Sequence, residues 1–206
     1  MRLLNGNEYK DEALVVREHF LYGVKPSNFT ETLAGTATIS YSGANLGNGV
    51  VNLAAPALND SALLYMNLPF RIDKWNRIEL AFYNTLINCN DDTKIAFSVA
   101  VRDVGAGNYV AFGLGSTTSL ITRTKRDGAE TINYFTVTPT KRHDYKIVAT
   151  ANTVDFYCDG SMVFRHTTNI PYDKDLKPAL FVKNNETGGG TSKILTCDRV
   201  ELALFI

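Results

Sequence analysis

Polar and aromatic side chains recur at alternate positions in three consecutive segments of this chain of 206 residues. The neighbouring positions in each segment hold large apolar residues. Arginine and glutamate can hydrogen-bond the hydroxyl groups of a ligand, and a tyrosine ring can stack against its apolar face. We therefore take six residues as candidates for a ligand-binding face. They are Arg77, Glu79, Tyr83, Ser98, Arg102 and Tyr109.

Other arrangements that carry chemistry are absent or incomplete. The histidines are His19, His143 and His166, and no serine stands in a Gly-x-Ser-x-Gly motif, so a nucleophile elbow is missing. The pair Gly105-x-Gly107 lacks the third glycine and the following helix of a nucleotide-binding loop. We interpret this pair as part of a turn and expect no catalytic residue in these motifs.

One acidic loop is a candidate metal site. It reads Asn88-Cys-Asn90-Asp91-Asp92. Carboxylate and amide oxygens are the ligands that calcium prefers, so Asn90, Asp91 and Asp92 could bind this ion. The alternative, which we prefer, is the solvated tip of a hairpin. No other metal and no cofactor is expected.

The cysteines point to no disulfide framework. Cys89, Cys158 and Cys197 make an odd number, and no two lie at metal-ligand spacing. The expectation is buried free thiols. We interpret the basic cluster Arg123–Asp127 as an exposed turn, and Trp75 as a residue that packs on the core.

The segments that carry these residues alternate between apolar and polar positions with a period of two, which indicates β-strands. Turn residues arrive every 8–12 positions, as in sandwiches and barrels. The one helix candidate is 8–20, and Val15-Val16 interrupts it. The sequence predicts an all-β chain, a two-sheet antiparallel β-sandwich (jelly roll) of about 12–14 strands in a single domain, 1–206. Residues 1–19 are a first strand or an N-terminal extension.

Fourteen segments match this pattern, and the three clearest carry the candidate face. In each of these three, one set of alternate residues is large and apolar and should face the core, and the other set is small, polar or aromatic. We expect the three second sets to form one groove-like face, with an ordinary solvated sheet face as the alternative. The fourteen segments are 36–41, 49–54, 61–66, 76–84, 94–103, 108–115, 119–123, 131–137, 143–150, 153–158, 161–165, 178–184, 193–196 and 199–206.

Two hairpins are marked by turn residues. The segment 103–108 contains Gly105 and Gly107, which can supply the positive φ angles of a tight connection. Asp159-Gly160 is a signal for a type I′ turn. The last segment ends in an apolar run, so we expect it to be docked in a sheet.

Composition limits the classes of partner. Basic and acidic residues both number 21, so the formal net charge is zero, and no basic surface for nucleic acid is expected. No apolar run approaches the roughly 18 residues of a membrane span, so no membrane insertion is expected. The first residues, 1–14, lack the apolar core of a signal peptide. Because a virion protein is released by lysis, an extracellular or virion location is favoured.

Several short motifs resemble those of the concanavalin A-like lectin/glucanase superfamily. The resemblance covers roughly residues 20–206 and implies a jelly roll. The motifs are His143-Asp-Tyr145-Lys-Ile147, Val154-Asp-Phe156-Tyr-Cys-Asp159-Gly160, Ile170-Pro171 and Pro178-Ala-Leu-Phe-Val182, with Gly49-Val-Val-Asn-Leu53 and Trp75-Asn-Arg-Ile-Glu79 upstream.

The resemblance implies a test for catalysis. Glucanases of this superfamily carry Glu-x-Asp-x-Glu on a groove-facing strand, because retaining hydrolysis needs two carboxylates about 5–5.5 Å apart. The segment matched to it here keeps Glu79 but has Ala81 and Tyr83 in place of the other two acids. Related alginate lyases use Gln-x-His, and this chain has no glutamine. We therefore expect a member without catalytic activity.

The resemblance and the candidate face together favour a binding or adhesion domain. The expected partner is a glycan or a cell-surface receptor, and a homo-oligomer is possible. An alternative is a structural virion or phage protein, such as a capsid, spike or tail component, on the same fold. A glycoside hydrolase or lyase with a non-standard site is a third hypothesis, which close carboxylates around Glu79 would favour.

Overall fold

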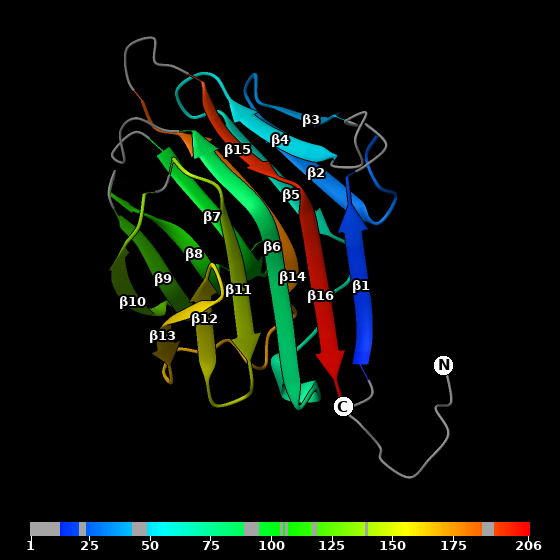
Figure 1. Cartoon of the computed structure of the whole chain (residues 1–206), viewed down its shortest axis with the longest axis vertical. Helices are drawn as coiled ribbons and strands as arrows, with labels where there is room; N and C mark the ends of the chain where they lie inside the picture. Colours follow the sequence, from blue (N-terminus) through cyan, green and yellow to red (C-terminus); the bar gives the residue numbers. More distant parts are fainter. Residues whose placement is uncertain are drawn as a thin grey trace.

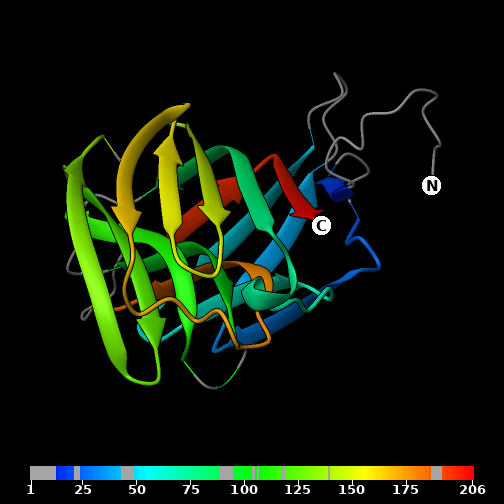
Figure 2. The same cartoon turned by 90° about the horizontal axis from the view of Figure 1, so that it is seen from below.

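The chain forms a two-layer β-sandwich. The structure, a computed structural model, describes residues 13–20, 24–42, 49–88, 95–103, 105, 107–116, 119–138, 140–186 and 192–206, and for residues 95–97, 115 and 116 it describes the backbone only. These residues contain sixteen strands and one 3₁₀ turn, Ile72–Lys74. All strand pairs are antiparallel, and Figures 1 and 2 show the two sheets facing each other. The predicted fold class is confirmed.

A nine-stranded sheet forms one layer. Its main path runs β13-β12-β11-β6-β15-β4-β3, and β16 lies between β6 and β1. The strands are β1 (Ala13–His19), β3 (Thr38–Ser42), β4 (Val50–Ala55), β6 (Arg77–Asn88), β11 (His143–Ala149), β12 (Val154–Cys158), β13 (Ser161–His166), β15 (Lys193–Cys197) and β16 (Arg199–Phe205). The long strand β6 is at its centre. Along one side of β6, β16 pairs with its first half and β15 with its second (Figure 1).

A seven-stranded sheet forms the other layer, in the order β10-β9-β8-β7-β14-β5-β2. Its strands are β2 (Phe29–Ala34), β5 (Ser61–Met66), β7 (Ile95–Arg102), β8 (Tyr109–Ser116), β9 (Ser119–Arg126), β10 (Ala129–Thr136) and β14 (Lys177–Asn184). All fourteen expected segments are strands of the structure. The predicted number of strands was too low because β1 and β2 add two more.

The helix candidate at 8–20 is not a helix in its described part, and of the two alternatives for residues 1–19 the structure shows the first strand. Residues Ala13–His19 form β1, which pairs antiparallel with β16. The β-branched pair Val15-Val16 suits a strand better than a helix, and β1 supplies hydrogen-bond partners to one edge of β16. The apolar C-terminal segment is docked as expected, with β6 on its other side.

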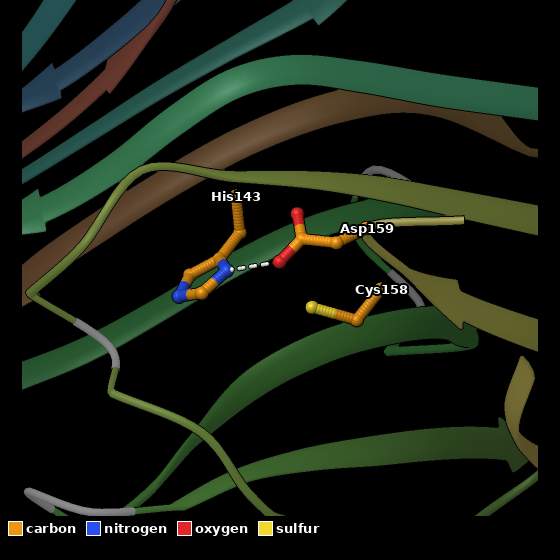
Figure 3. Close-up of side chains that lie close together, drawn as sticks. All are labelled: His143, Cys158 and Asp159. Atoms are coloured by element: carbon orange, nitrogen blue, oxygen red, sulfur yellow. Dashed lines mark hydrogen bonds and ion pairs between the residues drawn. The ribbon is translucent and has the colours of Figure 1, made fainter. Parts of the chain in front are cut away.

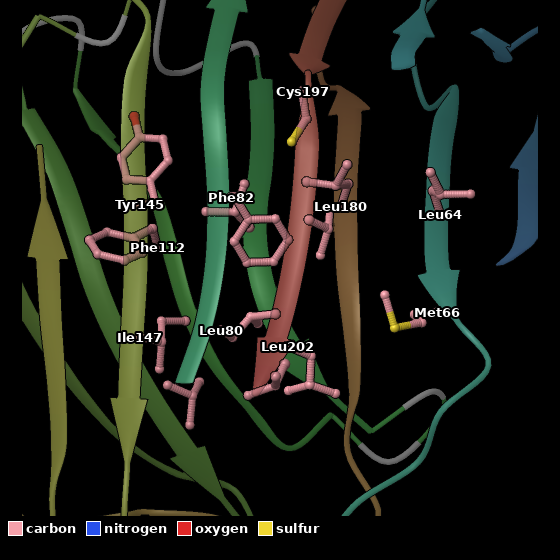
Figure 4. Packing of buried hydrophobic residues seen from close by; sticks show 14 of the residues in the cluster. Leu64, Met66, Leu80, Phe82, Phe112, Tyr145, Ile147, Leu180, Cys197 and Leu202 are labelled. Atoms are coloured by element: carbon pink, nitrogen blue, oxygen red, sulfur yellow. The ribbon is translucent and has the colours of Figure 1, made fainter. Parts of the chain in front are cut away.

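Alternate residues of the strands build one core between the sheets. Leu80 and Phe82 from β6 are fully buried, as are Val99 from β7 and Phe112 from β8. Figure 4 shows side chains of the two layers meeting in the middle. The assignment of inner and outer positions from the period of two is therefore confirmed for these strands. Trp75 packs against the edge of this core, as expected.

The expectation of one shared outer face is wrong. Strand β6 belongs to the nine-stranded sheet, whereas β7 and β8 belong to the seven-stranded sheet. The chain passes from one layer to the other between β6 and β7. Because the inner positions of all three strands face the same core, their outer positions point to opposite sides of the molecule.

The two predicted turns have the expected backbone. Asp159 and Gly160 have φ angles of 50° and 80°, as a type I′ turn requires. Gly105 and Gly107 also have positive φ, and β8 rather than a helix follows them. The interpretation of Gly105-x-Gly107 as a turn is therefore confirmed.

Candidate functional site

Three of the six predicted site residues meet at a cavity of about 140 Å³ on the outer face of the seven-stranded sheet. Ser98 and Arg102 come from β7 and Tyr109 comes from β8. We call this cavity the β8 pocket. It is lined by Ser98, Ala100, Arg102, Tyr109, Ala111, Phe112, Gly113, Arg123 and Phe181.

The floor of the β8 pocket is hollow because small residues are paired across the strands. Ala100 of β7 lies opposite Ala111 of β8, and Ser98 lies opposite Gly113. On the side of β14, Phe181 is the strand partner of Ser98. Small side chains beside larger ones leave room on a sheet face, which is how a shallow ligand site is formed.

On one wall of the β8 pocket, the lining residues Tyr109 and Arg123 share a hydrogen-bond partner, Glu130, which is not itself part of the lining. The hydroxyl of Tyr109 donates to Glu130 Oε1 at 2.6 Å, and Arg123 Nε donates to the same oxygen at 2.6 Å. The Arg123 guanidinium also lies over the Tyr109 ring, 5.3 Å from its centroid. These contacts fix the orientation of the ring toward the pocket.

The protonation states in this wall follow from its contacts. Burial, together with the hydrogen bond to Glu130, raises the pKa of Tyr109 to about 12, so the phenol keeps its proton at neutral pH. Burial disfavours the charged form of Glu130. The hydrogen bonds from Arg123 and Tyr109 outweigh this effect and hold the pKa of Glu130 below its ordinary value. Glu130 is therefore an anion that neutralises Arg123.

Arg102 has a different environment. Its guanidinium lies 5.6 Å from the centroid of the Phe181 ring, and its buried Nε has no hydrogen-bond partner. Burial lowers the pKa of Arg102, with partial compensation from Tyr109 and Asp103. A guanidinium stays protonated in proteins, so the β8 pocket contains a desolvated positive charge.

The other three predicted residues lie on the outer face of the nine-stranded sheet. Arg77, Glu79 and Tyr83 line a depression of about 480 Å³, together with residues of β11 and β12. Each is already engaged within the protein. Glu79 forms ion pairs with Arg77 at 3.2 Å and Lys146 at 2.8 Å, and the Arg199 guanidinium lies 3.7 Å from the centroid of the Tyr83 ring.

The carboxylates of this depression lie on the neighbouring strands β6 and β11. They belong to Glu79 and Asp144. Val148 is the strand partner of Glu79, and Asp144 precedes it by four residues on β11. At about 3.4 Å per residue the two backbone positions are separated by roughly 14 Å.

His143, Cys158 and Asp159 form a compact cluster that the sequence spacing did not indicate. One potential ligand atom of each lies within 4.8 Å of the others, and Figure 3 shows the three side chains converging. His143 Nδ1 lies 2.7 Å from Asp159 Oδ2, and its Nε2 lies 3.0 Å from the carbonyl oxygen of Thr138. Both ring nitrogens are therefore engaged within the protein.

The cluster is therefore better suited to a structural role than to metal binding. An ion would have to displace the contacts that both ring nitrogens of His143 already make. Burial, with the nearby carboxylates, raises the pKa of Cys158 to about 12, so its thiol keeps its proton. His143 fastens the start of β11 to the β12–β13 turn, as expected for a structural residue.

The remaining predictions on cysteines and calcium are only partly covered by the structure. Cys158 and Cys197 are buried free thiols, as expected. Cys89 and the calcium candidates Asn90, Asp91 and Asp92 lie outside the described residues. Within the described part of the chain, no helix is long and apolar enough to span a membrane.

His166 joins the two sheets and yields a prediction on pH. Its ring nitrogens lie 3.0 Å from the hydroxyls of Thr122 and Thr124, and Thr124 donates to the carbonyl of Thr168. Thr124 must then accept from Nδ1–H, and in the neutral ring Nε2 accepts from Thr122. Burial lowers the pKa of His166.

Lowering the pH from 7 to 5 is expected to reduce the free energy of unfolding. Below the ordinary histidine pKa of about 6.5, the unfolded chain binds a proton that the folded His166 binds less readily. Thermal unfolding at the two pH values measures the effect. His166→Gln should reduce the pH dependence, and His19→Gln, at an exposed position, should leave it unchanged. An equal dependence in wild type and His166→Gln would contradict this assignment.

The fold resembles that of several solved structures. No protein-family model matches the chain, and no curated protein matches it. A protein of unknown function from Shewanella oneidensis superposes with a TM-score of 0.72 at 12% identity, covering 98% of this chain and 90% of that one. A prokaryotic β-1,3-1,4-glucanase (lichenase) from a mouse hindgut metagenome gives 0.67 at 14%, covering 91% and 98%. A Bacteroides ovatus mixed linkage glucan GH16 protein in complex with a product gives 0.67 at 10%, covering 91% and 99%.

The chain has the concanavalin A-like jelly-roll fold. At these identities the similarity establishes the fold alone.

Two residues of the candidate site, Arg123 and Glu130, were not predicted from the sequence. The cluster 123–127 was interpreted as an exposed turn, but Arg123 is half-buried in strand β9 and faces the pocket.

Proposed function

We propose that this jelly roll is a glycan-binding protein without catalytic activity and that its site is the β8 pocket. The observation that carries the proposal is the combination of a hollow floor with an oriented tyrosine ring and polar side chains that line it. Sugar rings have an apolar face that stacks on aromatic rings and hydroxyls that hydrogen-bond polar groups.

Two further observations support the proposal. The lichenase and the product complex among the matched structures are proteins that act on or hold a glucan. The lining of the β8 pocket includes no carboxylate, and in the opposite depression the Glu79 carboxylate is held in ion pairs with Arg77 and Lys146. These two features of the carboxylates favour binding over hydrolysis.

Replacing Tyr109 with alanine is expected to weaken glycan binding at least about tenfold, because the stacking surface is lost. The measurement is a glycan-array screen followed by titration calorimetry on the best glycan. Tyr109→Phe keeps the ring and should retain most of the affinity. Tyr83→Ala, on the opposite outer face, is the matched comparison and should bind like wild type.

Each result has a definite meaning. Loss in Tyr83→Ala but not in Tyr109→Ala would move the site to the nine-stranded sheet and overturn the assignment. Absence of binding to every glycan would overturn the proposed function. The alternative of a structural virion protein stays a prediction, and a measurement of the oligomeric mass in solution tests it.

A further inference from the structure

The outer face around the β8 pocket is rich in positive charge. The strand registers align Lys177 of β14, Arg102 of β7, Tyr109 of β8 and Lys125 of β9 in one row across the sheet. Glu130 of β10 ends this row opposite Lys125. Three cations therefore share the row with a single carboxylate.

The carboxylate of this row is already committed. Glu130 accepts hydrogen bonds from both Tyr109 and Arg123, and Arg123 belongs to the next row of the face. The charge of Glu130 is thus balanced by Arg123. The positive charges of Lys177, Arg102 and Lys125 are therefore not balanced by a carboxylate of the row.

Arg102 is the central cation and the one nearest the hollow floor. It forms no ion pair with any of the described residues, and its buried Nε has no hydrogen-bond partner. Asp103, the next residue, attracts it electrostatically but accepts a hydrogen bond from Asn108 at 3.4 Å. A partly desolvated guanidinium without a carboxylate partner is unfavourable in a native structure, because charged groups lose hydration there.

The shape of the pocket places this unbalanced charge beside apolar surface. Phe181 lies under the Arg102 guanidinium, Tyr109 lies opposite it on β8, and the alanine pair Ala100 and Ala111 adjoins them. A ligand that fits must present an apolar ring face to the aromatic residues and an anionic group to the guanidinium. Arginine matches carboxylate and sulfate groups because its planar fork donates two parallel hydrogen bonds.

We propose that the β8 pocket binds a sugar that carries a negative charge, with its anionic group paired to Arg102. This inference rests on the proposed glycan-binding function and specifies its ligand class. The shared chemistry is an anionic group on a pyranose ring. Uronic acids and sulfated sugars both supply it, so the experiment treats them in separate arms.

The experiment titrates three oligosaccharides of equal length into the full chain. They are an oligouronate, a sulfated oligosaccharide and a neutral β-glucan. We expect at least tenfold tighter binding of an anionic oligosaccharide than of the neutral one at 50 mM NaCl, and a smaller ratio at 500 mM NaCl, because salt screens charge pairs. Arg102→Gln should reduce the anionic affinity at least tenfold, and Arg102→Lys should lose less because it keeps the charge.

Lys141→Gln is the matched control for net charge. It removes one positive charge from an exposed turn outside the β8 pocket and should leave the affinity unchanged. An equal loss in Arg102→Gln and Lys141→Gln would overturn the inference. If Arg102→Gln does not fold, the inference is tested by the salt dependence of oligosaccharide binding to the wild type and by the affinity of the Arg102→Lys variant.

The outcomes separate the two proposals. Preference for the oligouronate or for the sulfated oligosaccharide supports the inference and identifies the anionic group. Binding of the neutral β-glucan with equal or higher affinity overturns the inference and leaves the glycan-binding function standing. Absence of binding in all three arms and on the glycan array overturns both.

Discussion

Replacing Phe112 with alanine is expected to lower the free energy of unfolding by about 3–5 kcal/mol, the range for large aromatic truncations in a close-packed core. Phe112 is fully buried in β8. Its ring centroid lies 4.9 Å from that of Tyr145, 5.2 Å from that of Phe156 and 6.1 Å from that of Phe135. Tyr145 and Phe156 belong to the opposite sheet, so the substitution opens a cavity between the two layers (Figure 4).

Chemical and thermal denaturation measure this effect. For a chain of this size each kcal/mol shifts Tm by about 2–4 °C, so a decrease on the order of 10 °C is expected. Ile132→Ala is the control, since Ile132 lies on the outer face of the same sheet and is 40% exposed. Its cost should stay below about 1 kcal/mol. A similar cost for the two variants would contradict the packing of Phe112 between the sheets.

The sequence was sufficient to assign inner and outer positions of the strands. Burial of one set of alternate residues is a local property, and the pattern around Leu80, Val99 and Phe112 expresses it directly. The assignment of strands to sheets is not local. It depends on where the chain crosses between layers, and the alternation is the same on either side of the crossing. The six candidate residues were therefore identified as outer but wrongly placed on one face.

The pair Arg123 and Glu130 shows what further use of turn chemistry could have predicted. Asp127-Gly128 lies between β9 and β10, and both residues have positive φ. A two-residue turn of this type fixes the register of the hairpin, which here places Glu130 opposite Lys125. Glu130 is then diagonal to Arg123 on the same face, within reach of a long side chain. A turn signal was present in the sequence, and the ion pair follows from it.

The cluster of His143, Cys158 and Asp159 could not be derived in the same way. The turn at Asp159-Gly160 fixes β12 against β13, but the contact with His143 requires the pairing of β11 with β12. Sequence spacing between 143 and 158 does not determine that register, since β11 and β12 are joined by a separate turn. The two hydrogen bonds that hold His143 in place depend on this pairing and on the loop before β11.

Removing the Glu186 carboxylate is expected to destabilise the fold strongly, because it is an ion-pair partner of the buried Lys193. Lys193 is only 2% exposed in β15, and its Nζ lies 2.7 Å from Glu186 Oε2. Glu186→Ala should lower the free energy of unfolding by up to about 3–5 kcal/mol, because the buried ammonium loses one of the groups that compensate for its dehydration. The measurement is urea denaturation at pH 7.

The surface pair of Glu79 and Lys146 provides the matched control. Its atoms lie at 2.8 Å, almost the same distance, but the lysine side chain is 42% exposed. Glu79→Ala should cost less than about 1 kcal/mol, because water solvates the freed lysine. Equal costs for Glu186→Ala and Glu79→Ala would show that burial of Lys193 does not govern the effect.

The double variant Lys193→Met with Glu186→Leu separates loss of the pair from loss of one partner. Replacing a buried ion pair by apolar residues of similar size is often neutral or stabilising, since neither charge then needs to be dehydrated. We expect the double variant to be more stable than Glu186→Ala by at least about 2 kcal/mol. The sheet around β15 would then be held together by apolar packing, and each charge would matter mainly because it compensates the other. A double variant as unstable as Glu186→Ala would instead show that Lys193 and Glu186 are needed for their individual contacts.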